Sequence, residues 1–196
     1  MKYTQIPANT FEELQLNAGI LLSEFNPEDG SVSNESILGA TSGGVLFTDV
    51  PEYSDFGEDI DNCPKNTKEL KRIVSRAITM AGTYLTVSTK RAKSLAAAAD
   101  VDSTDTTKIV PRDTLEDTDF EDLWWVGDYS DKNGATNGGY IAIHLKNALS
   151  TGGFSLQSGD KAKGQLAFTY TAHYSIENIS DVPYEMYIKA GTEESA

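Results

Sequence analysis

The chain is poor in the residues that build reactive, metal-binding and disulfide-bonded sites. It has one cysteine, Cys63, and two histidines, His144 and His173. One cysteine excludes an intramolecular disulfide and does not suggest secretion, so we expect a reduced thiol without a role. Residues 1–22 have a polar, acidic stretch where a signal peptide needs an uninterrupted apolar core. No window approaches 18 apolar residues, and the sequence therefore predicts no transmembrane helix.

Enzyme motifs are also missing. The sequence has no HExxH, no CxxC and no GxSxG, and the glycine stretch 39–44 lacks the Lys-Ser/Thr of a phosphate loop, so we expect a turn there. Residues 129–134 resemble part of a calcium loop, but Tyr129 and Tyr140 occupy positions that need carboxylates. Both histidines lie in strand patterns and are expected to be structural. We expect no catalytic residue, metal or cofactor, although no pattern excludes that two of the 30 carboxylates meet in space.

Basic residues are scarce compared with acidic ones. The chain has 16 Lys and Arg against 30 Asp and Glu, a net charge of −14. Binding to the outside of a nucleic acid is disfavoured, because affinity there comes from cations that neutralise phosphates. A surface that stays close to DNA without adhering to it would instead be acidic.

Strand patterns dominate what the chain does contain. With 196 residues, 39% of them apolar, it can bury one sizeable core, and we expect a single domain over 1–190 with a disordered tail over 191–196. Turn residues separate runs of β-formers, which favours a mainly β fold, a sandwich or barrel with a flanking α-helix. The predicted strands are 73–80, 83–89, 140–145, 163–176 and 184–188. One of the rings of Trp124 and Trp125 is expected in the core.

One helix is predicted over 90–100, with Thr89 as N-cap and four alanines in its second half. A weaker helical pattern surrounds Asn147, and 100–122 is expected to be a loop. The helix begins with Lys90, Arg91 and Lys93, where the macrodipole disfavours cations. Either these bases form a solvated cluster or they contact carboxylates of another subunit.

Charged residues fall into two blocks, an acidic block over 49–61 followed by a basic block over 65–76. We predict a long hairpin arm around 51–66 that joins the two blocks. Opposed blocks within one subunit would contribute about 0.2–1 kcal/mol per pair. Alternatively, the blocks of two copies meet head to tail, and such contacts close into rings or continue as filaments. With the helix bases, the candidate interface residues are Glu52, Asp55, Glu58, Asp59, Asp61, Lys65, Lys68, Lys71, Arg72, Lys90, Arg91 and Lys93.

Three segments in order resemble the major tail tube proteins of long-tailed bacteriophages, of the siphophage type and particularly those of Gram-positive hosts. They are NTFEELQLNAGILLSEFNPEDG (9–30), ILGATSGGVLFTDVPEYSDFGEDIDNCPKNTKELKRI (37–73) and GGYIAIHLKNALSTGGFSLQSGDKAKGQLAFTYTAHYS (138–175). The resemblance covers nearly the whole chain and rests on no catalytic signature.

This resemblance implies a structural virion protein, made in the host bacterial cytoplasm, that is not an enzyme. Six copies would close their inner sheets into a ring, and stacked rings would form the tail tube through which DNA is ejected into the host. The arm and the N-terminal segment would reach the neighbouring ring, and the helix would lie outside the wall. Implied partners are further copies, the tape-measure protein and the tail initiator and terminator proteins. DNA would pass an acidic lumen without specific binding, and the chain would not insert into a membrane.

Two other classes stay open. The chain is also compatible with the tube protein of a contractile tail or of a phage-like injection device. A β-sandwich binding module would share the fold class and would use Trp124 or Trp125 as its platform.

Overall fold

The computed structural model describes residues 3, 5–130 and 138–191 of the chain. The described part is mainly β, with one α-helix, as the sequence predicts. The strands are β1 (Gln15–Leu22), β2 (Thr41–Asp55), β3 (Lys71–Tyr84), β4 (Ala99–Val101), β5 (Ile109–Pro111), β6 (Glu121–Tyr129), β7 (Gly139–Ser150), β8 (Ser155–Gln157), β9 (Gln165–Ala172) and β10 (Tyr184–Lys189). The helix is α1 (Thr89–Leu95), and the 3-10 turns are η1 (Thr10–Glu13), η2 (Lys68–Leu70), η3 (Asp117–Asp119) and η4 (Ile176–Asn178).

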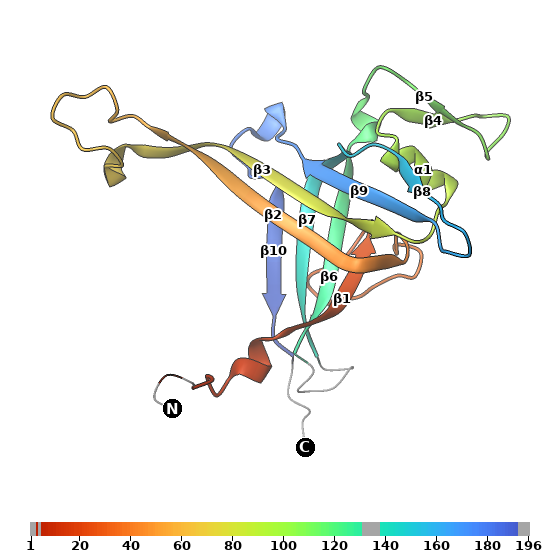
Figure 1. Cartoon of the computed structure of the whole chain (residues 1–196), viewed down its shortest axis with the longest axis horizontal. Helices are drawn as coiled ribbons and strands as arrows, with labels where there is room; N and C mark the ends of the chain where they lie inside the picture. The colour runs from red at the N-terminus through yellow and green to blue at the C-terminus, as the bar shows by residue number, and fades with distance from the viewer. Residues whose placement is uncertain (1–2, 4, 131–137, 192–196) are drawn as a thin grey trace.

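Eight strands form one antiparallel sheet in the order β1-β6-β7-β9-β3-β2, with β10 paired to β7 and β8 paired to β9. The sheet branches at β7, whose first half pairs with β10 and whose last residues, 148–150, pair with 170–172 of β9. As a result, β9, β3 and β2 cross in front of β10, β7 and β6 (Figure 1). A single sheet thus supplies both layers of a sandwich-like body.

The main core lies between these two layers. Alternate residues of β9, from Leu166 to Ala172, are buried, which confirms the period of two seen in the sequence. They pack with Met80 of β3 and Leu123 of β6, and Leu95 of α1 closes the core at one end. A smaller cluster on the other face of β6 and β7 contains Leu22, Phe25, Trp124, Val126 and Ala142, so one tryptophan does lie in a core.

The helix prediction is partly wrong. α1 ends at Leu95, and its N-cap is Ser88, whose hydroxyl accepts from the Arg91 backbone N–H at 3.2 Å. The alanines that follow leave the helix at Ala97, which has φ of 62°, and enter β4. Pairing of β4 with β5 supplies the backbone hydrogen bonds that a longer helix would have supplied, and tertiary pairing outweighs the propensity of alanine.

Four other local expectations are wrong for similar reasons. The predicted helix around Asn147 is part of β7, where Asn147 has φ of 48° beside a register shift. The strand predicted over 83–89 ends at Tyr84, and the loop predicted over 100–122 contains β4, β5 and η3. The glycine stretch 39–44 does not turn the chain but forms a bulge inside β2, where Gly43 and Gly44 have φ of 78° and 80°.

β2 and β3 extend well beyond the rest of the sheet. β3 pairs with β9 only from Thr79 to Tyr84, so residues 50–77 form a two-stranded hairpin that we call the arm. The arm projects from the body at one end of the molecule's longest axis (Figure 1). The hairpin predicted around 51–66 is present, with strands that continue to Asp55 and from Lys71.

The base of the arm is held by a partly buried ion pair. The carboxylate of Asp49 pairs with the Arg76 guanidinium and accepts from the Tyr184 hydroxyl of β10 at 3.0 Å. Replacing Arg76 with Met should lower the free energy of unfolding by about 2 kcal/mol, because Asp49 would keep one donor in a site that excludes most water. Urea denaturation measures this change. Arg72→Met is the control, since Arg72 is exposed and donates to the carbonyls of Glu69 and Lys71; an equal loss in both variants would contradict the prediction.

Candidate functional site

The two charge blocks lie on the facing halves of the arm, and part of their charge is paired inside the subunit. Lys65 pairs with Glu58 at 3.3 Å across the loop, and Arg76 pairs with Asp49. Asp55 organises the loop instead, since its oxygens accept from the backbone N–H groups of Asn66 and Gly57 at 2.7 and 2.9 Å. These two bonds, that from Asn66 first, lower the pKa of Asp55.

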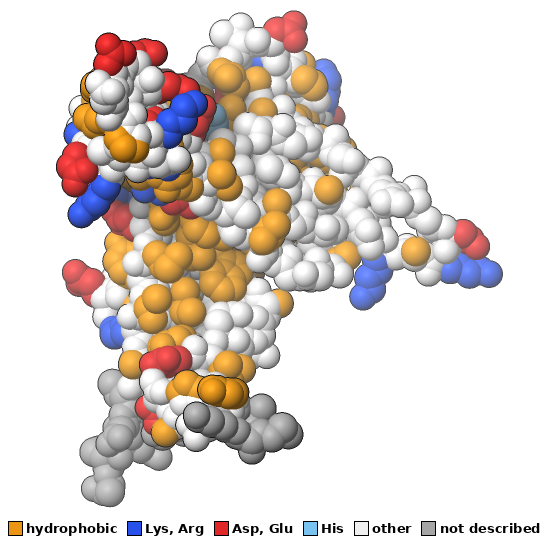
Figure 2. Space-filling model, turned by 60° about the vertical axis from the view of Figure 1, so that its left-hand side comes forward, with side chains coloured by type: hydrophobic (Ala, Val, Ile, Leu, Met, Phe, Trp, Pro, Cys, Tyr) orange, Lys and Arg blue, Asp and Glu red, His pale blue; other side chains and the backbone are white. Residues whose placement is uncertain are grey.

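The remaining charges of the arm are not used in ion pairs within the described residues. Glu52 accepts from the Ser75 hydroxyl, Lys71 donates to the Asn66 side chain and lies over the Tyr53 ring, and Arg72 binds backbone carbonyls. Asp59, Asp61 and Lys68 have neither a hydrogen-bond nor an ion-pair partner for their side chains in that part of the chain. Charge of both signs is therefore left exposed on the arm, which comes toward the viewer at the upper left of Figure 2.

Exposed apolar side chains accompany these charges, and sequence reasoning missed them. Phe56 is 62% exposed and Ile60 is 51% exposed in the loop, and Tyr53, Ile73 and Val74 are exposed on the strands. The signal was in the sequence, since Phe56 and Ile60 are embedded among acids in DFGEDID. Large apolar side chains gathered on a projecting element mark an interaction surface.

A second exposed surface carries no charged side chain on the body of the sheet, although the same face of β2 continues to Glu52 in the arm. It is the outer face of β2, β3, β9 and β8, which faces the viewer in Figure 1 because these strands lie in front of β7 and β6. Threonine pairs cross it, with hydroxyl distances of 2.6 Å for Thr48 and Thr79 and 2.7 Å for Thr151 and Thr171. By strand register, this neutral face comprises Ser42, Leu46, Thr48, Val50, Ala77, Thr79, Ala81, Thr83, Gln165, Ala167, Thr169, Thr171, Ser155 and Gln157.

The three bases of α1 do not act as one cluster. Arg91 is buried, and its guanidinium lies 4.2 Å from the centroid of the Tyr84 ring inside the subunit. Lys93 is half-buried, whereas Lys90 is exposed and has no carboxylate within ion-pair distance among the described residues. Of the three, Lys90 is the base that is free to meet a carboxylate of another chain.

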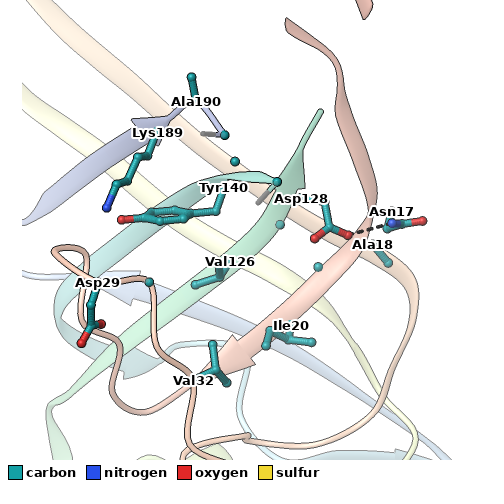
Figure 3. Close-up of a pocket in the computed structure, with 16 residues that line it drawn as sticks. Asn17, Ala18, Ile20, Asp29, Val32, Val126, Asp128, Tyr140, Lys189 and Ala190 are labelled. Carbon is teal, nitrogen blue, oxygen red and sulfur yellow. Dashed lines mark hydrogen bonds between the residues drawn. The ribbon is translucent and has the colours of Figure 1, made fainter. Parts of the chain in front are cut away.

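A cavity of about 600 Å³ lies between the loop after β1 and the ends of β1, β6, β7 and β10 (Figure 3). Its polar groups are already bonded to their neighbours. Asn17 donates to Asp128 at 2.7 Å, Lys189 donates to the Glu28 carbonyl at 2.6 Å, and the Tyr140 hydroxyl donates to the Pro27 carbonyl. These bonds hold the loop on the sheet and leave no convergent acid, base or nucleophile in the cavity.

Both histidines have structural neighbours. His144 stacks on Trp124 with ring centroids 4.0 Å apart and has Asp122 at 3.1 Å, and His173 lies 3.2 Å from the Asn147 carbonyl. The described residues contain no group of three or more His, Cys, Asp or Glu that would hold a metal ion. Most of the calcium-like stretch 129–134 lies outside the described residues.

No protein-family model matches the chain, and no curated protein matches it. Among the helices of the described residues, none has the length and hydropathy needed to cross a bilayer.

Proposed function

We propose that this chain is a structural virion protein that self-assembles into stacked hexameric rings, the tail tube of a long-tailed bacteriophage, through which DNA is ejected into the host. The observation that carries the proposal is the arm. An isolated two-stranded hairpin is marginally stable in water, and this one exposes six large apolar side chains, Val50 among them, beside unpaired charges. Such an element is best explained by a partner surface that covers it in the assembled state.

A second copy of the chain is the partner that best suits the arm. The arm occupies one end of the longest axis (Figure 1), and in the proposed assembly it contacts a surface at a different place on the next copy. A contact between two different surfaces is heterologous, and repeated heterologous contacts build rings or filaments. The tape-measure, initiator and terminator proteins would then be the other partners, as the resemblance implies.

The neutral face is our choice for the inner wall of the tube. Within the described part of the chain, β2 and β8 leave their outer edges unpaired on either side of this face, so neighbouring copies would have strand edges with which to extend the sheet. A wall of threonine and alanine offers duplex DNA no ammonium group with which to bind a phosphate. This assignment replaces the acidic lumen that the resemblance implies with an uncharged one, and the acids of the chain would face other surfaces.

Negative-stain electron microscopy of the concentrated protein, with its mass measured on the same sample, tests the proposal. We expect rings or tubes of uniform diameter with six-fold end views. Protein that stays monomeric, even after the tail initiator is added, would overturn the proposal and favour the binding module. The buried position of Trp124, and the bond from the Trp125 indole N–H to the Ala18 carbonyl, speak against a tryptophan platform for such a module.

A further inference from the structure

A small hollow lies beside the start of α1, at the other end of the molecule from the arm. It has a volume of about 330 Å³ and is lined in part by Ile37 and Val87, which are both exposed. Lys90 and Glu35 also line it and give it one charge of each sign. The hollow therefore presents an apolar patch flanked by a cation and an anion, neither of which has an ion-pair partner in the described residues.

The tip of the arm has the matching set of groups. Phe56 and Ile60 supply exposed apolar side chains, and Asp59 and Asp61 supply carboxylates that no described cation pairs with. Lys68, on the returning side of the loop, supplies an unpaired ammonium group. Apolar groups on both surfaces and charges of opposite sign are what a specific interface needs, because charge complementarity sets the register of the contact.

The two surfaces cannot meet within one chain. The arm and α1 lie at opposite ends of the longest axis of the molecule (Figure 1). The tip is also anchored through strands that continue into the sheet, so it does not fold back across the body. A contact between these surfaces therefore joins two copies head to tail.

We propose that the arm tip of one copy, residues 56–61, docks into the α1 hollow of a second copy. Phe56 and Ile60 cover Ile37 and Val87, while Asp59 and Asp61 lie against Lys90. In this arrangement Lys68 of the first copy lies near Glu35 of the second. The proposal rests on the proposed function to the extent that the partner is another copy of this chain, and it names the surface that receives the arm.

Disulfide trapping between two different variants tests the contact. In a Cys63→Ser background, one protein carries Ile60→Cys and the other Val87→Cys, and the two are mixed with oxidised glutathione. A disulfide forms only where the two Cα atoms come within about 7 Å. We expect a crosslinked dimer of the two variants on a non-reducing gel, in at least fivefold higher yield than when Ile60→Cys is mixed with Ile176→Cys. Ile176 is a stringent control because it is 92% exposed and lies outside the hollow. Equal yields would overturn the proposal.

A charge exchange tests the role of Lys90 in the same assay. Lys90→Glu in the Val87→Cys protein should lower the crosslink yield severalfold at low salt. Asp59→Lys and Asp61→Lys in the Ile60→Cys protein should then restore it, which a merely unfolded variant would not allow. A crosslink yield that is the same with and without these substitutions would overturn the pairing of Lys90 with Asp59 and Asp61. Electron microscopy distinguishes this result from the proposed function. Specific crosslinks without rings would refute the tube and support the contact. Rings without specific crosslinks would support the tube and refute the contact.

Discussion

Replacing Phe56 and Ile60 with serine will leave a folded monomer that no longer assembles into particles. Both side chains are exposed in the free subunit, so their loss has little effect on its stability. If an assembled contact covers them, each contributes about 1.5–3 kcal/mol, and losing both raises the dissociation constant of the contact by about a hundredfold or more. Sedimentation velocity of the variant and of the unchanged protein at one concentration measures the fraction in particles.

A matched control separates this effect from a general loss of apolar surface. Ile176→Ser with Ile179→Ser removes two side chains that are even more exposed and lie outside the arm. We expect that control to assemble like the unchanged protein. If the arm variant assembles equally well, the arm is not an assembly element and the observation on which the proposed function depends has another cause.

If the chain forms the proposed tube with the neutral face as its inner wall, replacing Thr79 with Lys will make that tube bind DNA. Thr79 lies in the middle of the neutral face, paired to Thr48 on one side and Thr171 on the other. In a hexameric ring this substitution adds six ammonium groups at one level of the wall, and cations that neutralise phosphates dominate DNA affinity. The lost hydroxyl bond to Thr48 costs about 1 kcal/mol, which a stable subunit tolerates. We expect short duplex DNA to co-sediment with the variant tubes at ~50 mM salt and to be released at ~0.5 M salt.

Ile176→Lys gives the same net charge at a surface outside the neutral face and is the comparison that matters. Its tubes should bind no more DNA than the unchanged tubes, because the surrounding surface belongs to a chain of net charge −14. Equal DNA binding by the two lysine variants would show that the neutral face is not the wall. The subunit would then require a different inner surface.

The sequence predicted those features of the fold that depend on local patterns. The alternation along β9 is visible in LAFTYTA because each second side chain packs into the core. The hairpin arm was predictable because a charged, turn-rich stretch separates two β-forming runs. The alanine run after Leu95 was misjudged because its hydrogen bonds are satisfied by pairing with residues 109–111, which no local pattern contains.

The interface role of the candidate residues stays a prediction. Asp59, Asp61 and Lys68 have no partner in the described residues and remain available for a contact, whereas Asp55 supports the arm's own loop and Arg91 packs on Tyr84. The neutral face could not be predicted from the sequence, because only the strand register shows which residues of the four strands lie on the same face. The α1 hollow combines residues 35–38 with 86–91, which the sequence separates widely.

The continuity of the arm with the sheet has a mechanical consequence. β3 belongs both to the arm and to the core, where residues 79–84 pair with 166–171 of β9. A force that pulls the tip along the strand direction acts in shear on the hydrogen bonds between β3 and β9. These bonds then bear the force together and do not break one after another. In the proposed assembly, a neighbouring copy that binds the tip would therefore be tethered to the core of the subunit, and a tube built in this way would resist stretching at every joint.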